Sequence, residues 1–307
     1  MINFKEQLKA SLNYQNISSS LFFQMKDGTI KRANIENQIA LPNMTSNYVS
    51  AINSQIINNE TLNQIVNISV ADARKNVLYK YDLQYYPDKL QQVNALSDGD
   101  VCANFIYGQD DLSQIYAYIV IIHCADKDIM LYRKFHPINI YKKGMIMWWQ
   151  VNRFDFVDED LLKLDNSFDF LKVDNIWYII NLNVLEQNMG YEGILQKETK
   201  PIIEKIKSID IIEDYQKFDV FCENITFAKK ILRASKSPVL DLQAALIIEF
   251  TKNYASLRNK FSYSENGKII ISSREKMNLF MKLLNDDLLK SELTQRHYES
   301  LAKDPSE

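Results

Sequence analysis

Glycine is scarce in this chain, with 7 residues among 307. Loops that cradle nucleotide phosphates need glycines at fixed spacing, because a residue without Cβ lets the backbone come close to the phosphates. Neither G-x-G-x-x-G nor G-x-x-x-x-G-K-[ST] occurs in the sequence. We therefore expect no Gly-rich nucleotide site and no cofactor.

Cysteine and histidine are also scarce, with 3 of each. These residues are Cys102, Cys124, Cys222, His123, His136 and His297. The cysteines are odd in number and lack C-x-x-C spacing, which predicts buried, reduced thiols in a reducing cytoplasm. The histidines lack zinc-ligand spacing, and no G-x-S-x-G motif supports Ser-His-Asp catalysis. We name no catalytic residue and no metal site, and we favour a protein that is not an enzyme.

Long apolar runs are missing too. The longest, Ile115–Cys124, is too short to span a bilayer. The first residues, Met1–Glu6, carry charge close to the start and no apolar core, so they do not look like a secretory signal. We expect a cytoplasmic protein whose link to any membrane comes through a partner.

The apolar pattern changes along the chain. Ile115–Ile122 and Asp128–Phe135 are apolar segments around a short turn, which predicts a β-hairpin. From Leu182 onward, apolar residues recur at three- and four-residue spacing, typical of helices. The expected helices there are Ile194–Ile206, Phe218–Leu232, Leu240–Tyr254 and Glu275–Leu289. Within this region, Asn266-Gly267 predicts a hairpin between Phe261–Ser264 and Lys268–Ser272.

These patterns predict an α+β fold. Its N-terminal part is a mixed sheet with hairpins and helices, and its C-terminal part is mainly helical with one β-hairpin. Because β content falls near residue 208, we expect two domains, a mixed α/β domain over 1–207 and a mainly helical, basic domain over 208–307.

Charge is unevenly distributed. The net charge is −3, yet the segment from Ala228 to Lys282 holds eleven Lys and Arg against four Asp and Glu, a local balance of +7. A segment of this charge on a mildly acidic protein could bind a polyanion. Our candidate DNA contacts are Lys229, Lys230, Arg233, Lys236, Lys252, Arg258 and Lys260. The competing interpretation is a set of solvated helix faces, with cations favoured at a helix C-terminus.

Two other groups carry charge. Arg133 and Lys134 end a predicted strand and could contact an anion or a partner, or could simply protect a strand edge. Carboxylates are frequent between residues 155 and 192. They are Asp155, Asp158, Glu159, Asp160, Asp169, Glu186 and Glu192. Such groups can ligate Mg²⁺ in nucleases, although no D-x-n-E-x-K pattern accompanies them.

Several short motifs follow one another in a fixed order from about Met130 to the C-terminus. They are Tyr132-Arg133-Lys134-Phe135-x-Pro137, Phe168-Asp169, Tyr178-Ile179-Ile180-Asn181, Glu186, and Leu288-x-x-Ser291-Glu292-Leu293-Thr294-x-x-x-Tyr298. In this order they resemble a bacterial family of domains of unknown function that includes the KwaB proteins of the Kiwa anti-phage defence system. Leu185 precedes Glu186 where the family pattern has Phe, which places a role for Glu186 in doubt.

The resemblance implies an effector that works with a multi-spanning membrane partner, KwaA, and binds DNA, interfering with phage replication and expression. It implies no catalytic residue. We therefore expect a non-specific DNA-binding protein, a homodimer, that is cytoplasmic and recruited to the inner membrane through its partner. Two alternatives stay open: a metal-dependent nuclease using Asp and Glu of 155–192, and a non-catalytic assembly protein that binds a partner or anionic lipid.

Overall fold

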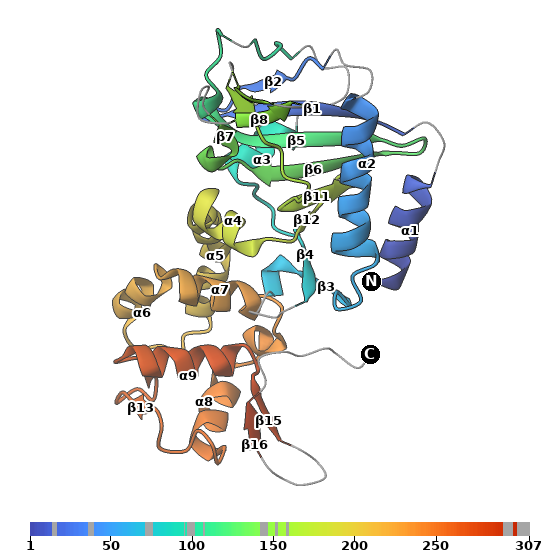
Figure 1. Ribbon diagram of the computed structural model, residues 1–307. Helices are drawn as coiled ribbons and strands as arrows, with labels where there is room; N and C mark the ends of the chain where they lie inside the picture. Colours follow the sequence, from blue (N-terminus) through green and yellow to red (C-terminus); the bar gives the residue numbers. More distant parts are fainter. Residues whose placement is uncertain are drawn as a thin grey trace. The chain divides into compact units, whose positions relative to one another are not determined.

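A computed structural model describes most of the chain (Figure 1). The described residues are 1–13, 17–35, 40–70, 76–94, 96, 102–106, 108–141, 147–150, 153–157, 160–290 and 297–299. The chain forms two compact units. The sheet unit comprises Met1–Val66, Asn76–Tyr81 and Pro87–Met189, and the helical unit comprises Asn67–Lys75, Asp82–Tyr86 and Gly190–Glu307.

The sheet unit is built on an eight-stranded sheet with the strand order β2-β1-β5-β6-β11-β12-β4-β3. Its strands are β1 (Ser18–Met25), β2 (Ile30–Arg32), β3 (Gln64–Asn67), β4 (Val77–Lys80), β5 (Ile115–His123), β6 (Asp128–Lys134), β11 (Phe170–Val173) and β12 (Ile176–Ile179). Six of its strand pairings are antiparallel, namely β1–β2, β1–β5, β5–β6, β6–β11, β11–β12 and β12–β4. The hairpin predicted from Ile115 to Phe135 is therefore confirmed as β5–β6.

Strand β5 is central, and this explains its nearly continuous apolar sequence. A strand buried on both faces needs apolar side chains at every position rather than at every second one. Helix α2 (Ala40–Ile52), which continues as a π-helical turn over Asn53–Ile57, crosses the strands on one face, as Figure 1 shows. On the opposite face, Tyr132 packs edge-on against the ring of Trp177. The Trp177 Nε1–H donates to Asn94 at the end of α3 (Asp88–Asn94), which anchors that helix.

The remaining elements of the sheet unit are short. They are α1 (Ile2–Leu12), α4 (Leu182–Asn188), and the strand pairs β7 (Ile140–Tyr141) with β10 (Leu161–Leu162) and β8 (Met147–Gln150) with β9 (Arg153–Phe156). Of the three cysteines, Cys222 is buried as expected, whereas Cys102 and Cys124 are only partly buried.

The helical unit packs its helices around a separate apolar core. Its elements are α5 (Tyr191–Ser208), α6 (Tyr215–Cys222), α7 (Ile225–Ala234), α8 (Ala244–Asn253), α9 (Arg274–Leu284), β13 (Ser262–Tyr263), β14 (Ile269–Ile270), β15 (Leu288–Lys290) and β16 (His297–Glu299). Phe218, Phe227, Ile231 and Phe280 are buried in this core. The hairpin predicted around Asn266-Gly267 is confirmed as β13–β14.

Three expected helices are shorter in the structure. Of the helix expected over Leu240–Tyr254, only Ala244–Asn253 is α-helical, because the chain before it forms a 3-10 turn over Pro238–Asp241 and is extended at Leu242 and Gln243. The other two are interrupted at residues that cap helices. Phe218–Leu232 is divided between α6 and α7, because Asn224 leaves the helical conformation and accepts a hydrogen bond from the backbone N–H of Thr226, which caps α7. The helix expected to reach Leu289 ends at Leu284, since Asp286 adopts a left-handed conformation at φ 53° and Leu288 begins β15. Apolar periodicity continues through both breaks, so only the capping residues could have revealed them.

The prediction of an α+β fold is confirmed. The expected domains, 1–207 and 208–307, stay a prediction, because compact packing does not show which segment can fold alone. No helix in the described part of the chain has both the length and the apolar character that a bilayer crossing requires.

Candidate nucleic-acid interface

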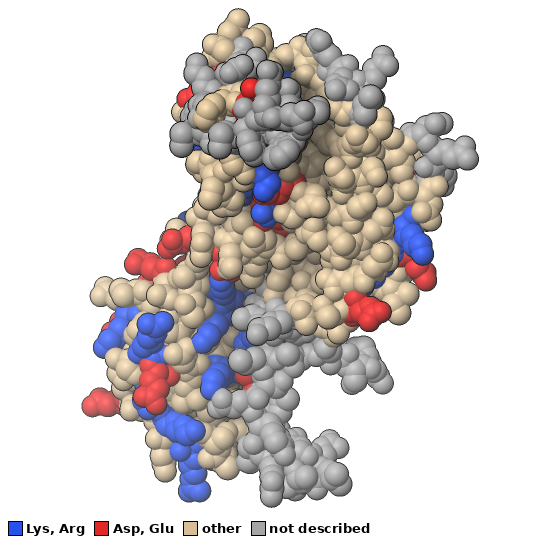
Figure 2. All heavy atoms as spheres, viewed as in Figure 1, with Lys and Arg blue, Asp and Glu red and all other residues tan. Residues whose placement is uncertain are grey.

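The basic region of the helical unit is centred on α7, α9 and the loop before β13. Figure 2 shows Lys and Arg gathered over the helices of this unit on the face in view, with some acidic residues among them. We define the basic surface as Lys230, Lys260, Arg274, Lys276 and Lys282. It arises because α7 and α9 bury their apolar faces against each other and leave their charged positions outside the core.

Lys230 lies where α7 meets α9. Its Nζ donates to the side-chain oxygen of Asn278 at 2.5 Å and lies 5.6 Å from the centre of the Phe227 ring. The guanidinium of Arg274 lies 5.9 Å from the same ring. Burial lowers the pKa of Lys230, and the neighbouring cations Arg233, Lys282 and Arg274 lower it further. The carboxylate of Asp287 partly offsets the effect of these cations on the pKa of Lys230.

A small cavity of ≈ 240 Å³ opens within the basic surface. Its charged lining is three lysines, Lys260, Lys276 and Lys282, and a single carboxylate, Glu275. The Lys276 ammonium donates to the backbone carbonyl of Lys260, which ties the loop to α9. A cavity with this excess of ammonium groups is suited to a phosphate or another anion.

Arg233, one of the predicted DNA contacts, has a different environment. Its Nη2 lies 2.6 Å from the carboxylate of the buried Asp287, and its Nε donates to the side-chain oxygen of Asn285 at 3.1 Å. Asn285 in turn donates to the backbone carbonyls of Lys230 and Met281. Arg233 thus joins α7 to the segment that follows α9, and this structural task competes with any contact to DNA.

The other predicted contacts are distributed around the unit. Lys229 is partly buried on α7, and Lys236 is exposed beyond the end of that helix. The Nζ of Lys252, on α8, lies 4.9 Å from the centre of the Tyr263 ring. Arg258 and Lys260 are exposed in the loop after α8. Their contact with DNA stays a prediction.

Sequence reasoning did not choose Arg274, Lys276 and Lys282 as contacts, although it counted their charges. The helical spacing held a signal for Lys282 alone. Lys282 shares one face of α9 with Glu275, Asn278 and Leu279, because residues at i, i+3, i+4 and i+7 lie on one side of a helix. What the sequence could not indicate is that this face lies beside Lys230, which precedes α9 by a full hairpin and helix.

In the sheet unit, three of the family motifs meet at a single carboxylate. Asp169 is 1% exposed and accepts hydrogen bonds from Arg133 Nη1 at 2.8 Å, from the backbone N–H of Lys134 at 2.8 Å and from Asn181 Nδ2 at 2.9 Å. Arg133 also lies 3.7 Å from the carboxylate of Asp165. The motif residues therefore bind β6 to the turn before β11 and the end of β12, which is a structural task.

Lys134 lies beside two further lysines. Its Nζ donates to the carbonyls of Tyr116 and Phe135, both at 3.1 Å, and lies 4.0 Å from the centre of the Tyr116 ring. Lys89 lies 4.9 Å from the centre of that ring. Burial lowers the pKa of Lys134, with a further contribution from Lys26. An anion or partner contact through Arg133 and Lys134 stays a prediction.

The structure places two of the carboxylates of 155–192 on separate elements. Asp169 precedes β11 and pairs with Arg133, and Glu186 lies on α4. Asp158 and Glu159 lie outside the described residues. In the described part of the chain, no group of three or more His, Cys, Asp or Glu is placed to hold a metal ion.

Comparison with known proteins gives two matches and one negative result. The family model described as Kiwa protein KwaB-like matches residues 112–294. The Kiwa protein KwaB of Escherichia coli O55:H7 (strain RM12579 / EPEC) is 26% identical over 310 residues, which cover 97% of this chain and 98% of that protein. No solved structure matches the chain.

Proposed function

Because the chain belongs to the Kiwa protein KwaB-like family, we propose that it is an anti-phage defence protein that binds DNA through the basic surface. In this proposal it recognises DNA without sequence preference and works with a membrane partner to block phage replication or expression. The observation that carries the proposal is the concentration of Lys and Arg on α7, α9 and the adjoining loop.

Charge crowding is the physical reason. The pKa of Lys230 is lowered partly because Arg233, Lys282 and Arg274 repel its ammonium charge. A DNA phosphate placed among these groups relieves that repulsion and releases counterions from the DNA, which is the main source of non-specific affinity. Lysine ammonium groups act as point charges that contact phosphates rather than reading base edges. Binding should therefore weaken steeply with salt and depend little on sequence.

The membrane partner is the second part of the proposal. The family relationship makes a membrane protein such as KwaA the expected partner, and we propose that it recruits this chain, as a homodimer, to the inner membrane. Expressed alone, the chain should fractionate in the supernatant, and co-expression with the partner should move it to the membrane fraction. Membrane association of the chain by itself, released by high salt, would instead support direct binding of anionic lipid.

The DNA test compares charge reversals on and off the basic surface. Arg274→Glu combined with Lys282→Glu should weaken DNA binding by about 1 kcal/mol per lost contact. Each lost contact should also reduce the slope of log K against log salt concentration by about 0.9. Lys229→Glu combined with Lys230→Glu tests the contacts chosen from the sequence. Arg233 is left intact, because a glutamate there would face the buried carboxylate of Asp287.

The matched control is Lys9→Glu combined with Lys200→Glu, which changes the net charge equally at two exposed positions outside the basic surface. Affinity and salt slope are measured by fluorescence anisotropy with duplexes of unrelated sequence. If the reversals in α9 leave both unchanged while the control behaves like the unmodified chain, the basic surface is a solvated helix face and the proposal fails. If the charge reversals abolish binding to phosphatidylglycerol vesicles but leave DNA binding intact, the assembly-protein alternative is favoured.

Cleavage is tested separately by incubating plasmid and single-stranded DNA with the chain and magnesium or manganese. The proposal expects no cleavage. Cleavage that Asp155→Ala or Glu186→Ala abolishes would establish the nuclease alternative. Asp169 is unsuitable for this test, because its carboxylate holds three donors in the folded sheet unit.

A further inference from the structure

Helix α8 has apolar residues on its outer side as well as on its inner side. Ile247 is 2% exposed and belongs to the core of the helical unit, whereas Leu246 is 53% and Phe250 39% exposed. Leu242, just before the helix, is 46% exposed. Leu246 and Phe250 are four residues apart and so follow one another along one side of the helix, and Leu242 lines the same cavity as both. A row of large exposed apolar side chains is typical of a surface that another molecule covers.

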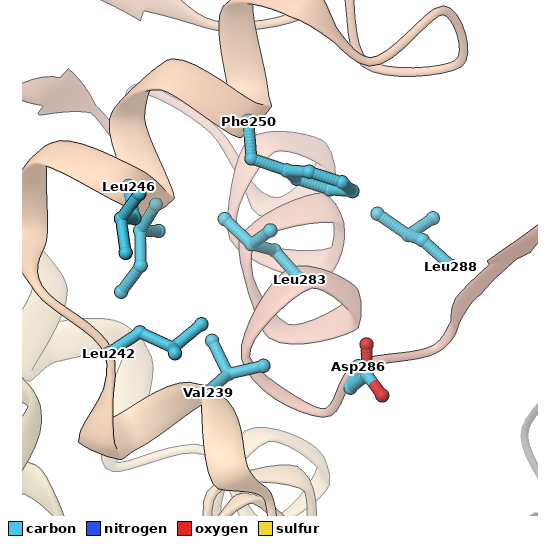
Figure 3. A pocket seen from close by; sticks show the side chains of 8 residues that line it. Val239, Leu242, Leu246, Phe250, Leu283, Asp286 and Leu288 are labelled. Carbon is cyan, nitrogen blue, oxygen red and sulfur yellow. The ribbon is translucent and has the colours of Figure 1, made fainter.

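This row borders a cavity of ≈ 280 Å³ (Figure 3). The cavity is lined by Phe250 of α8, Leu283 of α9, Leu288 of β15 and Val239 of the 3-10 turn Pro238–Asp241. A second cavity of ≈ 390 Å³ shares Leu246 and Phe250 with the first. Because Leu246 and Phe250 line both cavities, the two hollows are neighbours along α8, and we call them together the groove.

The charged residues that line the groove are acidic. Asp286 lines the first cavity and Glu249 lines the second, and both residues are exposed. Carboxylates at both cavities favour a cationic occupant and repel DNA and anionic lipid headgroups. A second copy of this chain fits poorly as well, since a two-fold contact would place α8 against α8 and bring the same carboxylates together.

We propose that this groove docks an amphipathic helix of a partner protein, with apolar side chains in the two cavities and Lys or Arg beside Asp286 and Glu249. Helices bind in such grooves through apolar residues at i, i+4 and i+7, which matches a groove that follows α8. The inference goes beyond DNA binding and does not depend on it, because the groove contains no residue of the basic surface.

The test uses the full chain and two labelled synthetic peptides. Both peptides carry leucines at i, i+4 and i+7, and they differ only in having lysine or glutamate around the leucines. The lysine peptide should bind and the glutamate peptide should not. Leu246→Gln should weaken binding at least about tenfold, equivalent to about 1.4 kcal/mol. Val220→Gln is the matched control, since Val220 is 67% exposed and lies outside the groove.

The charge is tested with Asp286→Asn. Asparagine has the shape of aspartate and tolerates the left-handed conformation found at this position, φ 53°. We expect a few-fold loss of affinity for the lysine peptide and a weaker dependence on salt. Circular dichroism and sedimentation of each variant check the fold and the oligomeric state.

Three results would overturn the proposal. The first is undetectable binding of both peptides, or equal binding of both. The second is a dimer that Leu246→Gln converts to a monomer, which would make a second copy the occupant. The third is binding of phosphatidylcholine vesicles that Leu246→Gln abolishes, which would assign the groove to lipid. Selective binding of the lysine peptide that Leu246→Gln removes and Val220→Gln leaves intact would support it.

Discussion

Replacing Asp169 should destabilise the sheet unit strongly, and the reason lies in the three donors that its carboxylate satisfies. Arg133, the backbone N–H of Lys134 and Asn181 all donate to a group that is 1% exposed. Asp169→Ala removes every acceptor and leaves the charge of Arg133 without its nearest partner. Breaking a buried ion pair in this way costs about 3–5 kcal/mol.

Asp169→Asn is the sharper variant. It keeps the size of the side chain but replaces one oxygen by an amide that donates, so at least one of the three donors then faces another donor. Because the Arg133 side chain is 22% exposed and water can reach part of it, we expect the low end of the range, about 3 kcal/mol. Asp165→Asn is the control, since Asp165 lies 3.7 Å from Arg133 and is 27% exposed; it should cost about 1 kcal/mol or less.

Equilibrium unfolding in urea, followed by tryptophan fluorescence, measures the effect, because Trp177 is fully buried in the sheet unit. Hydrogen exchange in β6 and β11 provides a local measurement that does not assume unfolding of the whole chain in one step. If the free energy of unfolding of Asp169→Asn lies within about 1 kcal/mol of that of the unmodified chain, the carboxylate does not hold these strands together. A role in ligand binding or catalysis would then explain the buried charge better than a role in stability.

Two further predictions concern a glycine and the cysteines. Gly28→Ala should destabilise the chain by about 1 kcal/mol more than Gly267→Ala in the same urea assay. Both glycines have positive φ, but only at position 28 would the added Cβ overlap the side chain of Gln92, which accepts a partly buried hydrogen bond from Gln24. Equal costs would contradict this prediction. Burial raises the pKa of Cys222 to about 12 and that of Cys124 to about 11. Neither thiol should therefore react quickly with iodoacetamide at neutral pH until urea unfolds the chain. Mass spectrometry of the labelled protein measures this reaction.

Local patterns in the sequence determined a large part of this fold. The β5–β6 and β13–β14 hairpins follow from apolar segments separated by short turns, and the change to helical periodicity after Leu182 predicted the helices of the second unit. The family relationship was also visible in the order of short motifs. These features depend on residues close together in the chain, where spacing alone sets which side chains share a face.

Only the tertiary structure decided how distant segments meet. The sequence shows Arg133, Asp169 and Asn181 as separate motifs, and the fold makes them one buried network because β6 and β12 both lie beside β11. It also pairs Arg233, a candidate DNA contact, with Asp287. Apolar residues on both sides of α8 satisfy the periodicity of a core helix, so the outer groove could not be read from spacing. Periodicity reports which residues avoid water together, whereas packing determines which neighbour, if any, covers them.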